Sequence, residues 1–178
     1  MKKAEALEFA ILGTLQDGPA HGYELRKRLN QVLGTFHAIS FGSLYPTLKA
    51  LGARGEVTER ADDTSSRRKI VYSVTDAGSK RFQTLLSNAG PDAWEDDTFG
   101  LHFAFFSRSN AETRTSILEG RRMRLAERRA FMRESLARTR EQIDAYTLEL
   151  QRHGLEGVER EMHWLEGLIA AEGKQNTN

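Results

Sequence analysis

The chain has 178 residues and no cysteine, and its 26 lysines and arginines nearly balance its 25 aspartates and glutamates. The lack of cysteine excludes disulfides, thiol catalysis and sulfur-ligated metal centres. No apolar run approaches the roughly 20 residues that a membrane-spanning helix needs. We therefore expect a cytoplasmic protein with no membrane segment.

The small net charge hides two basic blocks and one acidic block. Residues 1–81 hold 13 Lys and Arg against 9 Asp and Glu, residues 121–140 hold 8 against 2, and residues 141–172 hold 2 against 8. The front of the chain is therefore basic, as a DNA-binding segment would be. The two later blocks have opposite signs and could lie side by side, so their arginines are expected to be solvated or ion-paired helix surface.

Three helices are predicted in the first third of the chain. Apolar residues recur at helical spacing up to Gly18-Pro19, and a second amphipathic helix runs from about His21 to Gly34. Ser40 or Ser43 offers an N-cap for the third helix, which Gly55 closes. The third helix has an apolar side and a small, polar outer side made of Gly42, Ser43, Tyr45, Pro46 and Lys49.

A β-hairpin and a fourth helix are predicted next. Val57 begins an extended segment, residues 61–66 form a turn, and Ile70, Tyr72 and Val74 alternate as in a strand with one buried face. Thr75 caps the fourth helix. This order of elements predicts a winged helix-turn-helix domain over residues 1–88.

The rest of the chain is predicted to be helical. Ser109 and Glu112 form a capping-box pattern for one long helix that reaches Gly154, and a last helix ends at Gly173. We expect a mainly α protein with a small β-hairpin wing, a helical dimerisation and effector domain over 92–173 and a disordered tail over 174–178. The predicted dimerisation residues follow a seven-residue frame in the long helix and one stripe in the last helix: Leu118, Leu125, Met132, Leu136, Ile143, Tyr146, Leu150, Leu155, Val158, Met162, Leu165 and Ile169.

Several motifs in register resemble the PadR family of transcriptional regulators. They are L-x-F-A-I-L-G-x-L at 7–15, HGYEL at 21–25, GSLYPTL at 42–48 and K-x-V-Y-x-V-T-D-A-G at 69–78. The resemblance implies a homodimeric winged-helix repressor of dyad-symmetric operators that a small molecule or another signal releases, and the tail is similar to the long-tailed subgroup, which includes regulators of phenolic acid detoxification. Gly52 and the wing-tip Ser66-Arg67-Arg68 depart from the family pattern, which leaves the wing's groove preference open.

The DNA-contacting residues follow from the helix and the hairpin. The third helix would enter the major groove, and basic wing residues would grip phosphate. Its outer face has no Arg, Asn or Gln, so we expect operator spacing and DNA shape to contribute much of the specificity. The predicted contacts are Ser40, Gly42, Ser43, Tyr45, Pro46, Lys49, Arg67, Arg68 and Lys69, with Tyr23 and Tyr72 as packing residues that also touch DNA.

An aromatic cluster near the predicted domain boundary offers a place for a flat aromatic effector, with hydrophobic core as the alternative. It consists of Trp94, Phe99, His102, Phe103 and Phe106. The five histidines form no metal-binding pattern, and no phosphate loop or nucleophile elbow is present, so no metal, cofactor or enzymatic activity is expected.

The sequence thus predicts a DNA-binding transcriptional regulator whose partners are double-stranded DNA, a second copy of the chain and a small aromatic effector. Two alternatives stay open at this point. The chain could be a helical interaction scaffold that uses its winged helix to bind a protein, or a small-molecule-binding or catalytic dimer built on the aromatic cluster.

Overall fold

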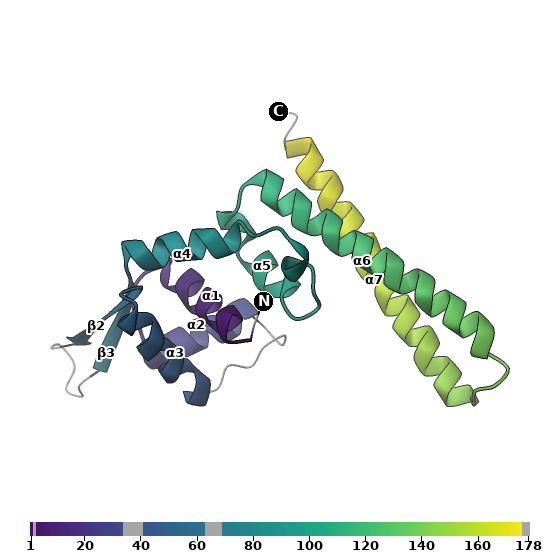
Figure 1. The fold of residues 1–178 in the computed structure, drawn as a ribbon, viewed down its shortest axis with the longest axis horizontal. Coiled ribbons are helices and arrows are strands. Elements are labelled where there is room, and N and C mark those ends of the chain that lie inside the picture. Colours follow the sequence, from purple (N-terminus) through teal and green to yellow (C-terminus); the bar gives the residue numbers. More distant parts are fainter. Residues whose placement is uncertain (2, 34–40, 63–68, 176–178) are drawn as a thin grey trace. The chain divides into compact units, whose positions relative to one another are not determined.

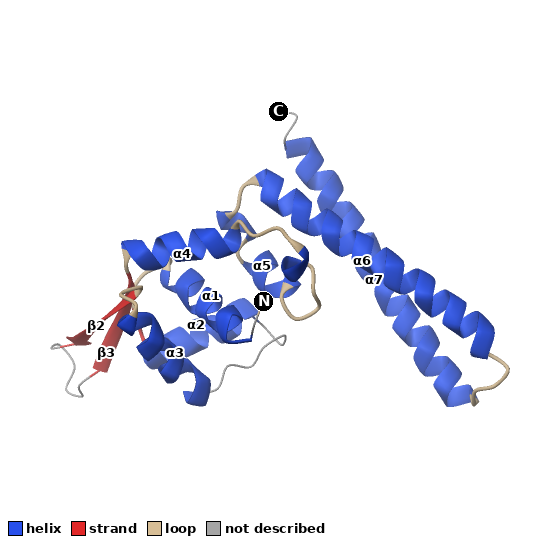
Figure 2. Ribbon diagram, in the orientation of Figure 1, coloured by secondary structure: helices blue, strands red, loops and turns tan. Residues whose placement is uncertain are grey.

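Helices make up most of the chain, and one small antiparallel sheet accompanies them (Figure 2). The computed structural model describes residues 1, 3–33, 41–62 and 69–175. These residues confirm the predicted fold class, which is mainly α with a β-hairpin wing. The chain divides into two units: residues 1–88 with 95–109, and residues 89–94 with 110–178.

The first unit is built on a bundle of α1 (Lys3–Leu15), α2 (Gly22–Leu33), α3 (Phe41–Ala53) and α4 (Asp76–Leu86) (Figure 1). Each helix has an apolar stripe at helical spacing, and the stripes meet in one core. Phe9 and Phe82 lie at its centre with their ring centroids 5.4 Å apart. The core is completed by three leucines on the inner side of α3: Leu44, Leu48 and Leu51.

A three-stranded sheet extends from the bundle, in the order β1-β3-β2. β2 (Val57–Asp62) and β3 (Lys69–Val74) form the predicted hairpin, with Val57 opposite Val74. The two-residue strand β1 (Ala20–His21) pairs with β3 and was not predicted, because so short a strand has no periodicity of its own.

Hydrogen bonds fix the end of α3 relative to the base of the β-hairpin. Gly55 has a φ of +70°, and the N–H groups of Gly55 and Glu56 donate to the carbonyls of Gly52 and Leu51, which is a Schellman cap. Thr75 caps α4, as predicted, by accepting from the Gly78 N–H, and its hydroxyl donates to the Gly55 carbonyl at 2.7 Å. The strand β2 and the helix α4 therefore start from fixed points beside the end of α3.

A closed ring of four charges joins α1, the connection between α3 and β2, and α4. Glu8 places one carboxylate oxygen 2.9 Å from Arg54 and the other 2.9 Å from Arg81. Glu56 likewise lies 3.0 Å from Arg54 and 3.6 Å from Arg81. Both carboxylates are largely buried, and the ring offsets their desolvation by giving each one two guanidinium partners. Glu8 and Arg81 lie far in the sequence from the neighbouring Arg54 and Glu56, so no local pattern predicts the ring.

Helix α5 (Phe99–Ala104) packs within the first unit. The ring centroid of Phe105 lies 5.4 Å from those of Phe9 and Phe82. The ring centroid of His102 lies 5.1 Å from that of Phe9. The apolar run at 98–106 thus adds to the winged-helix core. The division into functional domains at 88–92 stays a prediction, but the packing assigns residues 95–109 to the first unit.

The second unit is a two-helix hairpin of α6 (Ala111–Thr139) and α7 (Ala145–Gln175), which run antiparallel (Figure 1). The prediction of one continuous helix to Gly154 is wrong, because the chain turns between Thr139 and Ala145. Asp144 starts α7 by accepting from the N–H groups of Tyr146 and Thr147 and from the Thr147 hydroxyl. The bonds from Thr147 and Tyr146 lower the pKa of the Asp144 carboxyl.

Two predicted helix caps are corrected. The N-cap of α6 is Asn110, whose side chain accepts from the Thr113 N–H at 2.8 Å, and not Ser109. Ser43 lies inside α3 and is therefore not its N-cap, while Ser40 lies outside the described residues. Since α3 starts before Ser43, Pro46 stands beyond the first turn and has no N–H to donate to the Gly42 carbonyl.

The hairpin buries its apolar stripes between its own helices. Ile117, Leu118 and Leu125 of α6 are buried, as are Val158, Met162 and Leu165 of α7. The basic α6 and the acidic α7 are cross-linked by Arg114–Glu172, Arg121–Glu161 and Arg133–Glu159 ion pairs. The opposite charge blocks therefore do lie side by side. All three arginines are ion-paired, but only Arg133 lies on the helix surface, whereas Arg121 is buried.

Residues 89–94 pack on α6 through Trp94. A Cβ atom on Gly120 would come within 2.2 Å of the Trp94 ring, so only glycine leaves room for the indole there. The indole N–H donates to the Ala89 carbonyl, and buried Arg121 donates to the Trp94 carbonyl at 2.9 Å. Across the described residues, no helix is both long and apolar enough to span a lipid bilayer.

Candidate nucleic-acid interface

The outer face of α3 is open to solvent, as the sequence pattern predicts. Leu44, Leu48 and Leu51 point into the core, and the five residues predicted to face outward are all exposed: Gly42, Ser43, Tyr45, Pro46 and Lys49. The Thr47 hydroxyl donates to the Ser43 carbonyl at 2.8 Å and so stays within the helix. A helix with small, polar residues outward and leucines inward is the shape that fits a major groove.

A cleft of about 510 Å³ lies beside α3 and is lined by three tyrosines. Tyr23 comes from α2, Tyr45 from α3 and Tyr72 from β3. The rest of the wall is formed by His21, Gly22, Glu24 and Ile70. Nδ1 of His21 is 3.3 Å from the Ile70 carbonyl oxygen, which ties the end of β1 to the wing strand. The structure thus brings Tyr23, Tyr45 and Tyr72 together, although the sequence places them on three separate elements.

Gly22 sets the position of the Tyr45 ring. A Cβ atom at Gly22 would lie 2.7 Å from the Tyr45 hydroxyl oxygen and 3.0 Å from Cε1. Such distances are shorter than van der Waals contact, so the phenol can rest against α2 only because residue 22 lacks a side chain. The glycine of the HGYEL motif and the tyrosine of the GSLYPTL motif are therefore structural partners.

The three tyrosines differ in exposure. Tyr23 is 72% exposed and Tyr45 44%, whereas Tyr72 is buried at 4%. Burial raises the pKa of the Tyr72 phenol, and the charges of Glu59 and Tyr45 raise it further. Tyr23 and Tyr45 can reach a sugar or phosphate with their hydroxyls, while Tyr72 mainly supports the cleft wall.

Some of the basic residues of the wing lie among the described residues and others do not. Arg67 and Arg68 lie outside the described residues, and Lys69 begins β3. The exposed Arg60 lies on β2 opposite Val71, and the sequence analysis did not single it out. Its place in the first predicted strand, immediately before the predicted turn at 61–66, is the signal that would have added it to the wing contacts.

The predicted effector residues are distributed over both units. Phe99, Phe103 and Phe106 form a ring series in the first unit, with centroids 5.9 Å and 5.0 Å apart, and His102 is buried beside Phe9. Trp94 belongs to the second unit. Their use as a ligand site stays a prediction.

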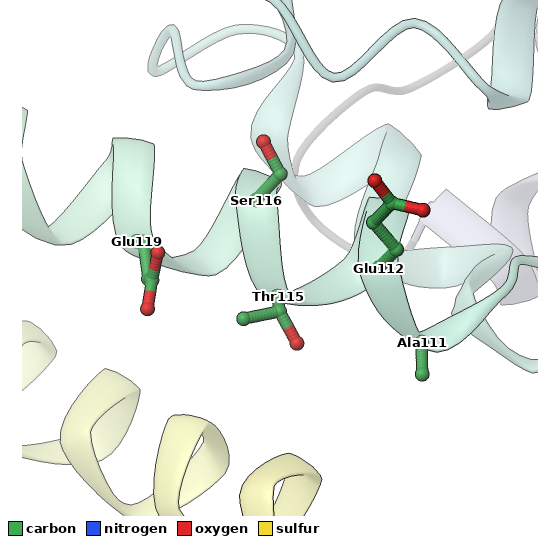
Figure 3. Close-up of a pocket in the computed structure, with 5 residues that line it drawn as sticks. All are labelled: Ala111, Glu112, Thr115, Ser116 and Glu119. Atoms are coloured by element: carbon green, nitrogen blue, oxygen red, sulfur yellow. The ribbon is translucent and has the colours of Figure 1, made fainter. Parts of the chain in front are cut away.

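A shallow hollow lies along the first turns of α6 and is lined by Ala111, Glu112, Thr115, Ser116 and Glu119 (Figure 3). All five residues come from this one helix, and Ser116 and Glu112 point away from the side toward which Ala111 and Thr115 point. The hollow therefore lacks the convergent polar groups of a ligand site.

The geometry of the first unit defines a class. A three-helix bundle whose third helix exposes a small polar face, followed by a β-hairpin, is a winged helix-turn-helix domain. The sequence comparison then gives a family match: residues 11–84 match the model of the transcriptional regulator PadR-like family.

One curated relative is the negative transcriptional regulator PadR of Bacillus subtilis (strain 168), with 31% identity over 86 residues. The match covers 48% of this chain and 47% of the relative, so the chain spans about half the length of the curated relative it matches.

Solved structures with similarity include Bacillus subtilis PadR in complex with operator DNA, at 22% identity and a TM-score of 0.47, covering 93% of this chain and 98% of that one. The regulator TA0346 from Thermoplasma acidophilum is 33% identical with a TM-score of 0.41, over 46% of this chain and 77% of that one.

Proposed function

We propose that this chain is a sequence-specific DNA-binding transcriptional regulator that acts in the cytoplasm as a homodimeric repressor. The observation that carries this proposal is the exposed outer face of α3 beside the tyrosine cleft, within a segment that matches the model of a family of transcriptional regulators. The name of the Bacillus subtilis relative, a negative regulator, supports repression.

The chemistry of the site favours contacts with the DNA backbone, which position the protein on the duplex, over recognition of bases. Lys49 is the one cation on the outer face of α3, and hydroxyl groups come from Ser43 and Tyr45. These groups suit phosphate and sugar contacts, which fix the protein on the duplex without identifying bases. Selectivity would then depend on the spacing of two half-sites and on DNA shape.

Replacing Lys49 with alanine is expected to weaken binding to the chain's own promoter duplex and to lower the slope of log affinity against log salt by about one. The reason is that one phosphate loses its cation and one fewer counterion is released. Fluorescence anisotropy over a salt series measures the slope. Lys80→Ala is the matched control, because Lys80 is exposed on α4 and lies outside the proposed interface. Equal slopes for wild type and Lys49→Ala would remove Lys49 from the contact face.

We propose further that a small aromatic molecule relieves repression through the aromatic cluster. The support is the sequence cluster itself, since six aromatic or histidine side chains, the five predicted residues and Phe105, occur within residues 94–106. Trp94→Ala is expected to reduce the release of promoter DNA by an aromatic acid such as a hydroxycinnamate while operator affinity stays within about twofold. Anisotropy of bound DNA during ligand titration checks this, and an unchanged response would exclude Trp94 from effector binding.

A further inference from the structure

The charge ring lies where the wing leaves the helical bundle. Its members are Glu8, Arg54, Glu56 and Arg81. Arg54 and Glu56 flank Gly55 in the connection between α3 and β2, and the hairpin of β2 and β3 projects from this point (Figure 1). The side chains of Glu8 and Glu56 are only 14% and 11% exposed. The carboxylates are therefore the buried half of the ring.

Glu56 is the residue through which the ring reaches the wing. Its N–H donates to the Leu51 carbonyl at 3.0 Å, and its carbonyl accepts from the Thr75 N–H at 3.1 Å. Its carboxylate accepts from Nε of Arg54 at 3.1 Å. A Cβ atom on Gly78 would lie 2.1 Å from the Glu56 carbonyl oxygen, so α4 approaches this backbone as closely as a glycine permits. Since β2 starts at the next residue, the position of Glu56 sets the start of the wing.

Glu8 is the tighter of the two acidic bridges between the arginines. One of its carboxylate oxygens lies 2.9 Å from Arg54, and the other accepts from Arg81 of α4, also at 2.9 Å. Nε of Arg81 lies 3.6 Å from Glu56, which is longer than a hydrogen bond, and this buried atom has no hydrogen-bond partner within the described part of the chain. The link from the wing base to α1 and α4 therefore depends most on Glu8.

Stability alone is a weak reason for such a ring. Burying carboxylates and guanidinium groups costs free energy that their mutual attraction roughly offsets, and packed apolar side chains often stabilise a fold as well or better. Hydrogen bonds between charged groups differ from apolar contacts because they are directional. The ring is therefore better suited to set the orientation of the wing than to add to the free energy of folding.

The hairpin amplifies any change of angle at its base. β2 extends from Val57 to Asp62, so its far end lies about 20 Å from Glu56 at about 3.3 Å per residue. A tilt of about 10° at the base would move that end by about 3 Å, which is the length of a hydrogen bond. Two proposed phosphate contacts lie toward this end, namely Arg60 on β2 and Lys69 at the start of β3. A small rotation is thus enough to separate them from the duplex.

We propose that the charge ring holds the wing at the angle at which the wing and α3 contact DNA together, with Glu8 as the main positioning residue. Glu8 acts through the wing and does not itself touch DNA. The effect on DNA binding rests on the proposed function, whereas the orientation of the wing is measurable without DNA.

Glu8→Gln separates positioning from simple electrostatics, because the two predict opposite effects on DNA binding. The substitution removes a negative charge, so electrostatics alone would raise the affinity for the promoter duplex. The proposal instead predicts an affinity about tenfold lower or less, and a slope of log affinity against log salt that falls by about one to two, because wing phosphate contacts are lost. Fluorescence anisotropy over a salt series measures both. Glu172→Gln is the control, since it makes the same change in an ion pair of the second unit at 16% exposure, and its affinity should stay within about twofold of wild type.

A double-mutant cycle with Arg60 identifies the wing as the element that moves. Arg60→Ala is expected to lower the salt slope by about one in wild type and to have no further effect in the Glu8→Gln background. A variant that is only less stable would respond to Arg60→Ala as wild type does. Arg81→Lys is the second positioning variant. It keeps the net charge but replaces the guanidinium fork with a single ammonium, so it is expected to cause the same losses.

Spin labels measure the orientation of the wing directly, and the absence of native cysteine allows them to be placed at chosen positions. We would label Ala61→Cys on β2 and Lys80→Cys on α4, which are both exposed, and dilute the labelled chain with unlabelled chain. Double electron–electron resonance should give one narrow distance distribution with the ring intact. In the Glu8→Gln and Arg81→Lys backgrounds the distribution should shift or broaden by about 3 Å. Circular dichroism and urea unfolding check that each variant is folded.

The proposal is overturned if folded Glu8→Gln and Arg81→Lys keep the wild-type distance distribution. It is equally overturned if wild type binds the promoter selectively and both variants keep its affinity and salt slope, and in that case the proposed function stands. A distribution that changes with the ring, in a protein that shows no preference for promoter DNA, would support the role of the ring in wing orientation and contradict the proposed function.

Discussion

Replacing Gly22 with alanine is expected to lower the affinity for the promoter duplex by about tenfold or more while leaving the thermal stability of the protein nearly unchanged. The new methyl group would lie 2.7 Å from the Tyr45 hydroxyl oxygen, so the phenol must move away from its place against α2. We expect this movement to cost little folding free energy, because Tyr45 is 44% exposed and its ring is the far end of a flexible side chain. Anisotropy titrations and thermal unfolding measure the two effects separately.

A double-mutant cycle separates this explanation from a general effect of alanine on α2. In the Tyr45→Ala background, Gly22→Ala has no ring to displace and is expected to cause no further loss of affinity. Gly52→Ala is the control for a glycine in a helix, since the nearest atom to a Cβ built there is the Val57 carbonyl oxygen at 3.8 Å. Equal losses from Gly22→Ala in both backgrounds would show that Gly22 does not act through Tyr45.

Lowering the pH from about 7 to about 5 is expected to reduce the free energy of unfolding by about 2 kcal/mol through His102 alone. The His102 side chain is 2% exposed, and burial lowers the pKa of its imidazole from 6.5 to about 4, with a smaller contribution from the N-terminal ammonium. As the pH falls, His102 is therefore protonated near pH 6.5 in the unfolded chain but only near pH 4 in the folded chain. Stability is complete above the unfolded pKa and is lost as the pH falls through this window.

His102→Leu is expected to remove most of this loss, since leucine fills the site beside Phe9 without titrating. Urea unfolding of the wild type and the variant at several pH values measures the effect. His163→Gln serves as the control, because the His163 side chain is 92% exposed. If His102→Leu keeps the wild-type pH dependence between pH 7 and pH 5, then another group is responsible for it.

The first unit was predictable because its determinants are local. The leucine spacing of α3, the Gly55 stop and the Thr75 cap act within a few residues, and each is found where the pattern indicated. The outward direction of Tyr45 and Lys49 follows from the same periodicity. Their contacts with DNA stay predictions.

The second unit shows why periodicity alone misleads. A seven-residue frame continues from Leu118 through Leu150, but it does not say whether the chain folds back on itself. The turn is set by Asp144, whose side chain caps α7, and by the gain from burying both stripes against each other. Tyr146 and Leu150 keep the spacing of the frame yet end up exposed.

Contacts between distant segments account for the rest of what the sequence could not show. Three contacts join elements that no spacing rule relates. They are the charge ring that includes Glu8 and Arg81, the packing of Tyr45 on Gly22 and the packing of Trp94 on Gly120. The membership of α5 in the first unit likewise depends on the packing of Phe105 on Phe9.

The most direct test of the central claim is a titration of the full chain with its own promoter duplex and with a shuffled duplex of equal length and composition, each at two salt concentrations. A regulator that binds as proposed will prefer the promoter by at least about 1,000-fold and will lose affinity steeply as salt rises. Equal affinity for both duplexes, or binding that does not respond to salt, would contradict the assignment of the α3 face and the wing as a DNA-binding surface.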